Sequence, residues 1–228
     1  MLFHKAQSHE EAHNRLGIGM PIGSKHYRAF VGPPEKYDLV AAMQFNLLTA
    51  LGLRENHTLL DIGCGSLRAG RLFIPYLLSG NYFGLEPNRW LIAQGVDKEI
   101  GEDLLRIKRP VFDHNDEFKL TAFGRQFDYL LAQSIFSHAA PGQIKTCLEE
   151  AKKVMHPKSI FVATYSPGQQ NYDGCEWLYP ECATYTEGYM LQLATNAGLV
   201  AVPHPWEHPN DLRWLLITQA DHVRRDAS

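Results

Sequence analysis

Five apolar runs along the chain have the length and composition of buried β-strands. They occupy residues 58–62, 81–85, 111–114, 127–136 and 159–165. Near-continuous apolar runs are typical of parallel strands that helices cover on both faces. Because segments of helical periodicity separate these runs, the pattern predicts consecutive βαβ units, and therefore an α/β fold with a mostly parallel sheet.

Helices are expected before the first strand and between the later ones. Apolar residues recur at helical spacing after Asp38, which we interpret as the N-cap of a helix that ends at Gly52. Further helices are expected from the glycine turn to about Pro75, from Pro87 onward, over 97–109, over 144–155, and from an N-cap at Thr186 to Ala197. Two more strands, 199–202 and 212–218, complete the predicted elements.

Two segments lack any regular period. Residues 1–36 are polar and rich in glycine and proline, and residues 166–185 hold glycine, proline and aromatic residues. Long irregular segments in a compact domain usually serve a function. We therefore expect an arm or cap at 1–36, one domain over 37–228, and a substrate lid at about 166–185.

Composition limits the classes of protein to which the chain can belong. Its 228 residues are 45% apolar and 21% charged, which suits a single domain with a sizeable core. The net charge of −3 disfavours broad nucleic-acid binding, although a local basic groove stays open. No apolar run is long enough to cross a membrane, and the N-terminus lacks the apolar core of a signal peptide. The oligomeric state is left undetermined.

The cysteines and histidines do not form a recognisable metal motif. The four cysteines include no CxxC pair and no disulfide framework, which is typical of a reducing compartment and predicts a cytoplasmic protein. The 11 histidines show no HExxH spacing, so we expect no metal. One alternative is a zinc site that uses Cys175 and Cys182 with nearby histidines.

The most specific motif is LLDIGCGSLRAG at residues 59–70, between a predicted strand and a predicted helix. Gly63 and Gly65 allow a sharp turn and the close approach of a ligand where a Cβ atom would collide. The exposed N–H groups at the following helix start favour a negative group such as a carboxylate. Asp61, at the end of the strand, can accept hydrogen bonds from a ligand.

The ends of three later strands carry residues that could contact the same ligand as the glycine turn. Glu86 ends the second strand, where a carboxylate can chelate the two ribose hydroxyls of an adenosine ligand. Asn115 and Asp116 follow the third strand, where either can contact an adenine amino group. The fourth strand leads into AQSIFSH at 132–138, which we expect beneath the reacting centre.

On these residues the chain resembles the class I S-adenosylmethionine-dependent methyltransferases, especially the small-molecule group described as type 11 or type 12. The resemblance implies a Rossmann-like fold with helices on both faces of a seven-stranded sheet, which ends in an antiparallel hairpin. It implies S-adenosylmethionine as cofactor and a small-molecule methyl acceptor, methylated on oxygen or nitrogen; a sugar or a natural-product intermediate is suggested by analogy alone. The expected cofactor-binding residues are Asp61, Gly63, Cys64, Gly65, Arg68, Glu86, Pro87, Asn115, Asp116, Gln133 and Ser134.

The glycine turn departs from the family pattern at one position. Leu67 stands where a third glycine is usual, and the adjacent Arg68 is also unexpected. Arg68 either binds the cofactor carboxylate or begins the helix and faces solvent. Cys64 is expected to be a packed small side chain rather than a nucleophile.

His138 is the candidate general base, because histidine accepts a proton near neutral pH. The alternative is a structural or helix-capping histidine. An aromatic substrate wall is expected from the two irregular segments and their neighbours, although aromatic residues at such places are also common in a core. Its candidates are Tyr27, Tyr37, Tyr165, Trp177, Tyr179 and Tyr185. His208 is a further substrate candidate, with a rigid structural turn as the alternative.

Three rival functions stay open. A nicotinamide-dependent oxidoreductase would need GxGxxG, but Arg68 occupies the position of the third glycine. An RNA or protein methyltransferase is disfavoured because the fourth strand is followed by no NPPY-type signature. A non-catalytic module that binds S-adenosylmethionine would share every motif above and differ only in turnover.

Overall fold

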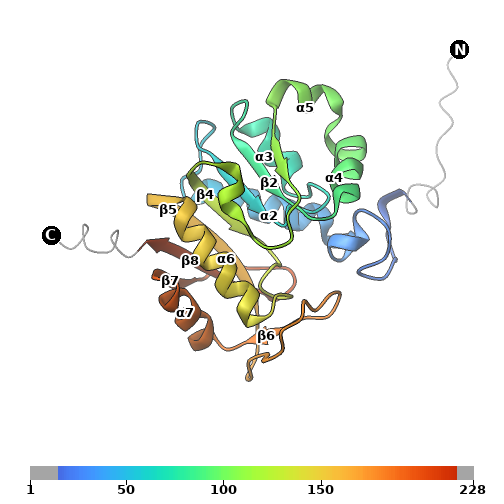
Figure 1. Cartoon of the computed structure of the whole chain (residues 1–228). Helices are drawn as coiled ribbons and strands as arrows, with labels where there is room; N and C mark the ends of the chain where they lie inside the picture. Colours follow the sequence, from blue (N-terminus) through green and yellow to red (C-terminus); the bar gives the residue numbers. More distant parts are fainter. Residues whose placement is uncertain (1–14, 220–228) are drawn as a thin grey trace, which may run out of the picture.

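A mixed β-sheet forms the centre of the computed structural model, which describes residues 15–219 (Figure 1). The strands lie in the order β3-β2-β1-β4-β5-β8-β7. Their bounds are β1 Leu59–Ile62, β2 Tyr82–Leu85, β3 Val111–Asp113, β4 Phe127–Ala132, β5 Met155–Pro167, β7 Leu199–His204 and β8 Arg213–Gln219. The first five pair in parallel, whereas β8 runs antiparallel to both β5 and β7. The predicted α/β fold with a C-terminal antiparallel hairpin is therefore confirmed.

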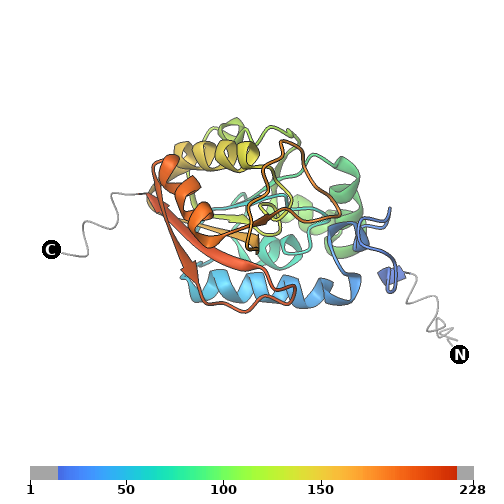
Figure 2. The same cartoon turned by 90° about the horizontal axis from the view of Figure 1, so that it is seen from below.

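Helices cover both faces of this sheet. On one face pack α2 (Tyr37–Ala50), α3 (Gly70–Tyr76) and α4 (Arg89–Gly95), and on the other pack α6 (Pro141–Val154) and α7 (Glu187–Asn196). Figure 2 shows α2 and α6 on opposite sides of the strands. Successive side chains of a strand alternate between the two faces, so adjacent residues such as Leu59 and Leu60 belong to separate core clusters.

Several predicted helix boundaries need correction. Asp38 is not an N-cap, because α2 begins at Tyr37 and the Asp38 carboxylate pairs with Arg71. The helix expected from Pro87 begins at Arg89. The helix expected over 97–109 is divided by Gly101, whose φ of 77° separates a π-helical turn at Val96–Ile100 from α5 (Glu102–Lys108). Thr186 does cap α7, since its side chain accepts a hydrogen bond from the backbone of Tyr189.

The strands also differ in length from the apolar runs. β4 ends at Ala132 rather than at 136, because the chain turns at Ser134 with a φ of 61°. β5 is longer than expected, and its end pairs with an additional short strand, β6 (Thr184–Tyr185). This pairing joins the beginning of the segment 166–185, which continues β5, to its end.

The N-terminal segment 15–36 is held against the helices by a buried ion cluster around Glu99. Arg28 Nη2 lies 2.6 Å from one Glu99 oxygen, and Arg71 Nη1 lies 3.2 Å from the other. Tyr27 also donates its hydroxyl to Glu99, over 2.9 Å. The Arg28 guanidinium stacks over the Tyr37 ring at 4.4 Å. The cluster therefore fixes the segment to α2, α3 and the π-helical turn. Residues 1–14 of the predicted arm lie outside the described part of the chain.

The substitution Glu99→Gln is expected to lower the free energy of unfolding by about 3 kcal/mol, since it leaves two arginines without their buried anionic partner. Urea denaturation would measure the change. The matched control is Asp103→Asn, which breaks an ion pair whose two side chains are 91% and 75% exposed and should leave stability nearly unchanged. Equal effects of the two substitutions would contradict this account of the cluster.

Candidate functional site

A cavity of about 740 Å³ lies at the carboxyl ends of the parallel strands. Its wall includes side chains that follow β1, β2, β3 and β4, together with parts of the segments 15–36 and 166–185. This volume is within the range of sites that bury small organic ligands. In an open α/β sheet, the ends of the parallel strands are the expected place for such a ligand.

The glycine turn after β1 forms the floor of the cavity. Gly63 and Gly65 have φ values of 71° and 56°, which favour glycine. A Cβ atom on Gly63 would lie 2.1 Å from Cδ1 of Ile135, and one on Gly65 would lie 2.7 Å from Cγ1 of Val31. Leu67, at the position of the usual third glycine, is fully buried with a φ of 60°. The turn thus keeps its left-handed path at that position without glycine.

Asp61 ends β1 and is buried at the cavity wall. The Tyr82 hydroxyl donates a 2.7 Å hydrogen bond to its Oδ2 atom. Burial raises the pKa of Asp61 to about 6, against the opposing effects of Tyr82 and Arg68. Its remaining oxygen is available to a hydrogen-bond donor in the cavity.

Glu86 follows β2, and its carboxylate is held next to the glycine turn. The N–H of Gly65 donates to Oε2 over 3.1 Å, while the backbone and side-chain amides of Asn88 donate to Oε1 over 2.8 and 2.9 Å. Burial nevertheless raises the pKa of Glu86 above its usual value. Because Oε2 accepts only one of these bonds, it retains capacity for a hydroxyl group.

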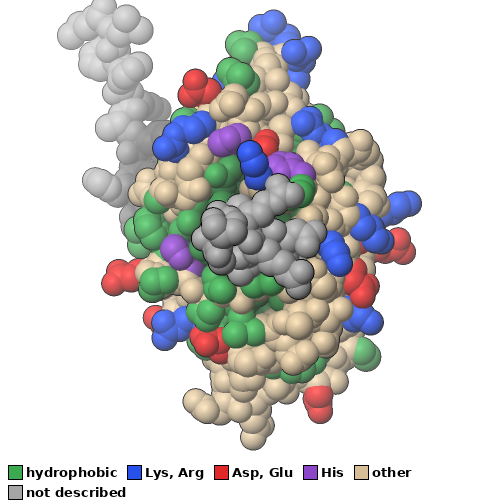
Figure 3. All heavy atoms as spheres, turned by 90° about the vertical axis from the view of Figure 1, so that its left-hand side faces the viewer, with side chains coloured by type: hydrophobic (Ala, Val, Ile, Leu, Met, Phe, Trp, Pro, Cys, Tyr) green, Lys and Arg blue, Asp and Glu red, His purple; other side chains and the backbone are tan. Residues whose placement is uncertain are grey.

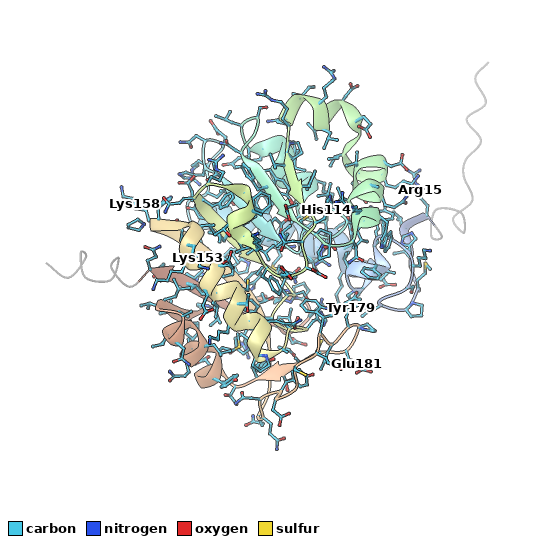
Figure 4. The ribbon with its side chains drawn as sticks, viewed as in Figure 1. Arg15, His114, Lys153, Lys158, Tyr179 and Glu181 are labelled. Carbon is cyan, nitrogen blue, oxygen red and sulfur yellow. The ribbon has the colours of Figure 1, made fainter. Side chains whose placement is uncertain are left out.

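The end of β3 contributes two neighbouring residues with different roles. The Asn115 side chain is engaged locally: it donates to Asp113 and accepts a 2.8 Å bond from the backbone of Lys119. Asp116 is exposed, lines the cavity and makes no hydrogen bond to the residues that the structure describes. His114, labelled in Figure 4, joins this edge to β2, since its Nδ1 lies 2.7 Å from the Glu86 carbonyl. Of the two candidates, Asp116 has the free polar atoms.

Arg68 is a buried cation at the cavity wall. Its Nη1 donates to the Val31 carbonyl over 2.6 Å, and its Nη2 donates to the side chain of Gln133. Its Nε is buried and has no hydrogen-bond partner, and within residues 15–219 no carboxylate lies in salt-bridge range of it. Burial accordingly lowers the pKa of Arg68. An unpaired buried charge is costly, so an anionic group is the ligand that this position favours.

His208 lies behind Gln133 and outside the cavity lining. Its Nε2 is 3.1 Å from the Gln133 side-chain nitrogen, and its Nδ1 accepts a 3.0 Å bond from the backbone of Asn210. Burial, with the positive charges of Arg68 and Lys36, lowers the pKa of His208 to about 4. His208 is therefore neutral at physiological pH and supports Gln133.

His138 follows β4 and faces the cavity. Its Nδ1 lies 2.9 Å from the Leu178 carbonyl and 2.7 Å from the Glu181 carbonyl. Carbonyl oxygens only accept, so Nδ1 carries the proton and Nε2 is left as an acceptor. Burial lowers the pKa of His138, which favours this neutral form. The side chain thus anchors the segment 166–185 through one nitrogen and keeps a lone pair on the other.

The remaining candidates from the sequence divide into two groups. The first group lines the cavity and comprises Cys64, Pro87, Ser134, Trp177 and Tyr179. Burial raises the pKa of the Cys64 thiol, which disfavours its reactive thiolate form. The rest do not reach the cavity lining: Tyr27 and Tyr37 pack around the Glu99 cluster, and Tyr165 and Tyr185 lie in the core beside α6 and α7.

Part of the cavity wall was missed from the sequence. The segment 15–36 supplies lining residues that no spacing or motif indicated, and α2 and several loops supply others. The main ones are Ile22, Phe30, Val31, Gly32, Pro33, Lys36, Gln44, Phe118, Ile135, Pro180, Cys182, Asn210 and Leu212. Only the apolar and aromatic character of these loops could have drawn attention to them.

Residues 15–219 contain neither a metal-binding cluster nor a membrane-spanning helix. No group of three or more His, Cys, Asp or Glu side chains between residues 15 and 219 is placed to hold a metal ion. Over the same part of the chain, no helix has the length and apolar character needed to cross a membrane.

Comparisons with known proteins agree with this arrangement. Residues 60–161 match the family model described as a methyltransferase domain, and this range contains the glycine turn, Glu86, Asp116 and His138. Magnesium protoporphyrin IX methyltransferase from Synechocystis PCC 6803, with bound SAH, is 12% identical with a TM-score of 0.63, covering 92% of this chain and 93% of that one.

Two other solved structures share the fold at similarly low sequence identity. The glycopeptide N-methyltransferase MtfA complexed with S-adenosyl-L-methionine is 10% identical, with a TM-score of 0.60 and coverage of 78% of this chain and 94% of that one. The CcbJ methyltransferase from Streptomyces caelestis is 14% identical, with a TM-score of 0.60 and coverage of 83% and 98%. At such identities the likeness concerns the fold.

The buried state of His208 predicts acid sensitivity. Between pH 6.5 and about 4, the unfolded chain binds a proton at His208 that the folded protein excludes, so the free energy of unfolding should decrease as pH falls. The contribution is about 3 kcal/mol across this window, at 1.36 kcal/mol per pKa unit. His208→Asn removes the titrating group, so urea titrations should show a shallower pH dependence than for the unmodified chain. Identical slopes would show that His208 titrates normally in the folded state.

Proposed function

We propose that this chain, whose residues 60–161 form a class I S-adenosylmethionine-dependent methyltransferase domain, methylates an oxygen or nitrogen atom of a small molecule. The observation that carries the proposal is the position of Glu86. Its carboxylate lies against the N–H of Gly65, so the acid after β2 and the glycine turn after β1 face the same cavity. A carboxylate placed in this way suits the two hydroxyls of a ribose.

The chain's own residues at the strand ends and the glycine turn fit S-adenosylmethionine. The left-handed glycines leave space where Cβ atoms would collide, and the buried Arg68 has an unpartnered Nε. We assign Glu86 to the ribose hydroxyls of the cofactor, Asp116 to its adenine amino group and Arg68 to its carboxylate. Asp61 suits the ammonium group of the same ligand. The further candidates are wall residues: Gly63, Cys64, Gly65, Pro87, Asn115, Gln133 and Ser134.

When bound, S-adenosylmethionine supplies a methyl group on a positively charged sulfur, which makes that methyl reactive toward an acceptor oxygen or nitrogen. The protein's part is then alignment, exclusion of water and removal of a proton. His138 suits the last task, because its Nδ1 proton is held by two carbonyls and its Nε2 can accept a proton from the acceptor. The same two contacts set the orientation of the ring.

A small-molecule acceptor is favoured over a nucleic acid. The net charge is −3, and acidic and basic side chains are interspersed around the face shown in Figure 3 rather than gathered by sign. A cavity roofed by two loops also suits an acceptor of limited size. Relatives in structure include enzymes named for a porphyrin and a glycopeptide, so these relatives leave the acceptor class open.

All four cysteines are free, which supports a cytoplasmic location.

Glu86→Ala is expected to weaken the binding of S-adenosylhomocysteine by at least about 100-fold, because two hydrogen bonds to a charged group are lost, each worth about 1.5–3 kcal/mol. Isothermal titration measures the dissociation constant directly. Glu117→Ala, which removes an exposed glutamate outside the cavity lining, should leave the constant unchanged. Similar constants for both variants would remove the central support for the assignment of Glu86.

His138→Gln is expected to lower kcat about 100-fold to 10,000-fold with the acceptor identified by screening, while S-adenosylhomocysteine still binds. For the unmodified chain, kcat should fall as pH drops through the lowered pKa of His138, since Nε2 then carries a proton. The variant should lose this dependence, and His204→Gln, outside the cavity, serves as the control. A variant with full activity and an unchanged pH profile would leave His138 with a structural role alone.

A further inference from the structure

The mouth of the cavity exposes apolar surface on two separate segments. Ile22 of the N-terminal segment is 43% exposed and Trp177 of the segment 166–185 is 41% exposed, and both line the cavity. Large apolar side chains left exposed at a concave site often mark where a ligand binds. An apolar ligand that entered the mouth would cover both.

Aromatic rings continue from this mouth to His138. The Phe30 and Tyr179 rings lie 5.4 Å apart, and the Tyr179 hydroxyl donates to the Phe30 carbonyl. On its other side, Tyr179 meets the His138 ring edge to face at 4.9 Å, and Trp177 lies 5.8 Å from the same ring. Figure 4 shows Tyr179 on the inner side of the loop and Glu181 farther out. The two segments are thus joined directly above the candidate base.

This part of the wall carries no formal charge. We call Ile22, Phe30, Trp177 and Tyr179 the aromatic rim. The charged groups at the strand ends and the turn, Asp61, Glu86, Asp116 and Arg68, lie instead where the cofactor is assigned. Lys36 also lines the cavity, but its ammonium group donates to the Pro209 carbonyl over 2.6 Å.

We infer that the aromatic rim binds an uncharged, planar aromatic acceptor whose hydroxyl or amine group lies against Nε2 of His138. Aromatic faces pair favourably with one another beyond the effect of buried area. A polyhydroxylated acceptor such as a sugar would instead need many polar partners. The side chains of the rim offer two polar groups, the Trp177 indole N–H and the Tyr179 hydroxyl, and the second is already bound to Phe30. The inference rests on the proposed function, because it names the acceptor of that same site.

The test uses 2-naphthol and its saturated counterpart decahydro-2-naphthol as probes, each titrated into the full chain saturated with S-adenosylhomocysteine. The two probes have the same ring connectivity and the same hydroxyl, but only 2-naphthol is planar and aromatic. We expect 2-naphthol to bind about threefold to tenfold more tightly, which corresponds to one or two aromatic contacts. Trp177→Leu and Phe30→Leu keep apolar volume and should each remove most of this preference.

Trp206→Leu is the matched control, since Trp206 lies outside the cavity lining and its removal should preserve the preference. Unchanged affinity for S-adenosylhomocysteine shows that each variant is folded. If that ligand binds but the two probes bind equally, or neither binds, the aromatic acceptor is wrong and the proposed methyltransferase function still stands. If S-adenosylhomocysteine does not bind the unmodified chain, the proposed function fails, and the acceptor site fails with it.

Discussion

The parallel pairing of β1 with β2 on one side and β4 on the other brings Asp61, the glycine turn and Glu86 to one cavity. In this register Asp61 sits opposite Gly84 of β2 and Leu131 of β4. The N–H groups of Gly63 and Cys64 both donate to the Leu85 carbonyl, over 2.8 and 3.1 Å. The glycine turn is therefore tied to the end of β2, and Glu86, the residue that follows β2, comes within hydrogen-bond distance of Gly65. A shift in register would separate the two halves of the site.

The same edge of the sheet holds three buried ionisable side chains, which a core selected for stability alone would avoid. Burial raises the pKa of Asp61 and Glu86 and lowers that of Arg68. Tyr82, Asn88 and backbone groups offset part of this cost through hydrogen bonds. Perturbed ionisable groups that converge on one cavity are a physical sign of a ligand site. A ligand that carries hydroxyls and a carboxylate would satisfy the groups that the protein leaves free.

The sequence was informative wherever a residue's role is decided by nearby residues. The strands from β1 to β5 could be predicted because buried parallel strands are continuous apolar runs between helical patterns. The cavity positions of Asp61, Gly65, Glu86 and Asp116 followed from their places at strand ends, since parallel strands bring those ends to one edge. Thr186 was recognised as a cap by the local pattern, whereas Asp38 was misassigned because its partner, Arg71, lies in a different helix.

The side chains with which the two irregular segments line the cavity could not be predicted individually, because contacts between distant residues place them. Arg28 meets Glu99 and Phe30 meets Tyr179 across long stretches of chain, and no periodicity encodes either pair. The aromatic candidates show the consequence: Trp177 and Tyr179 line the cavity, while Tyr37 and Tyr165, candidates for the same wall, are buried elsewhere. The lack of a regular period predicted a functional role for these segments, but only the fold shows which of their side chains line the cavity.

The central claim is that the cavity is built for S-adenosylmethionine rather than for another adenosine cofactor. Parallel isothermal titrations of the unmodified chain with S-adenosylhomocysteine and with NAD test it most directly. We predict saturable binding of S-adenosylhomocysteine at one site per chain and no binding of NAD. Saturable binding of NAD, or no binding of S-adenosylhomocysteine, would contradict the account.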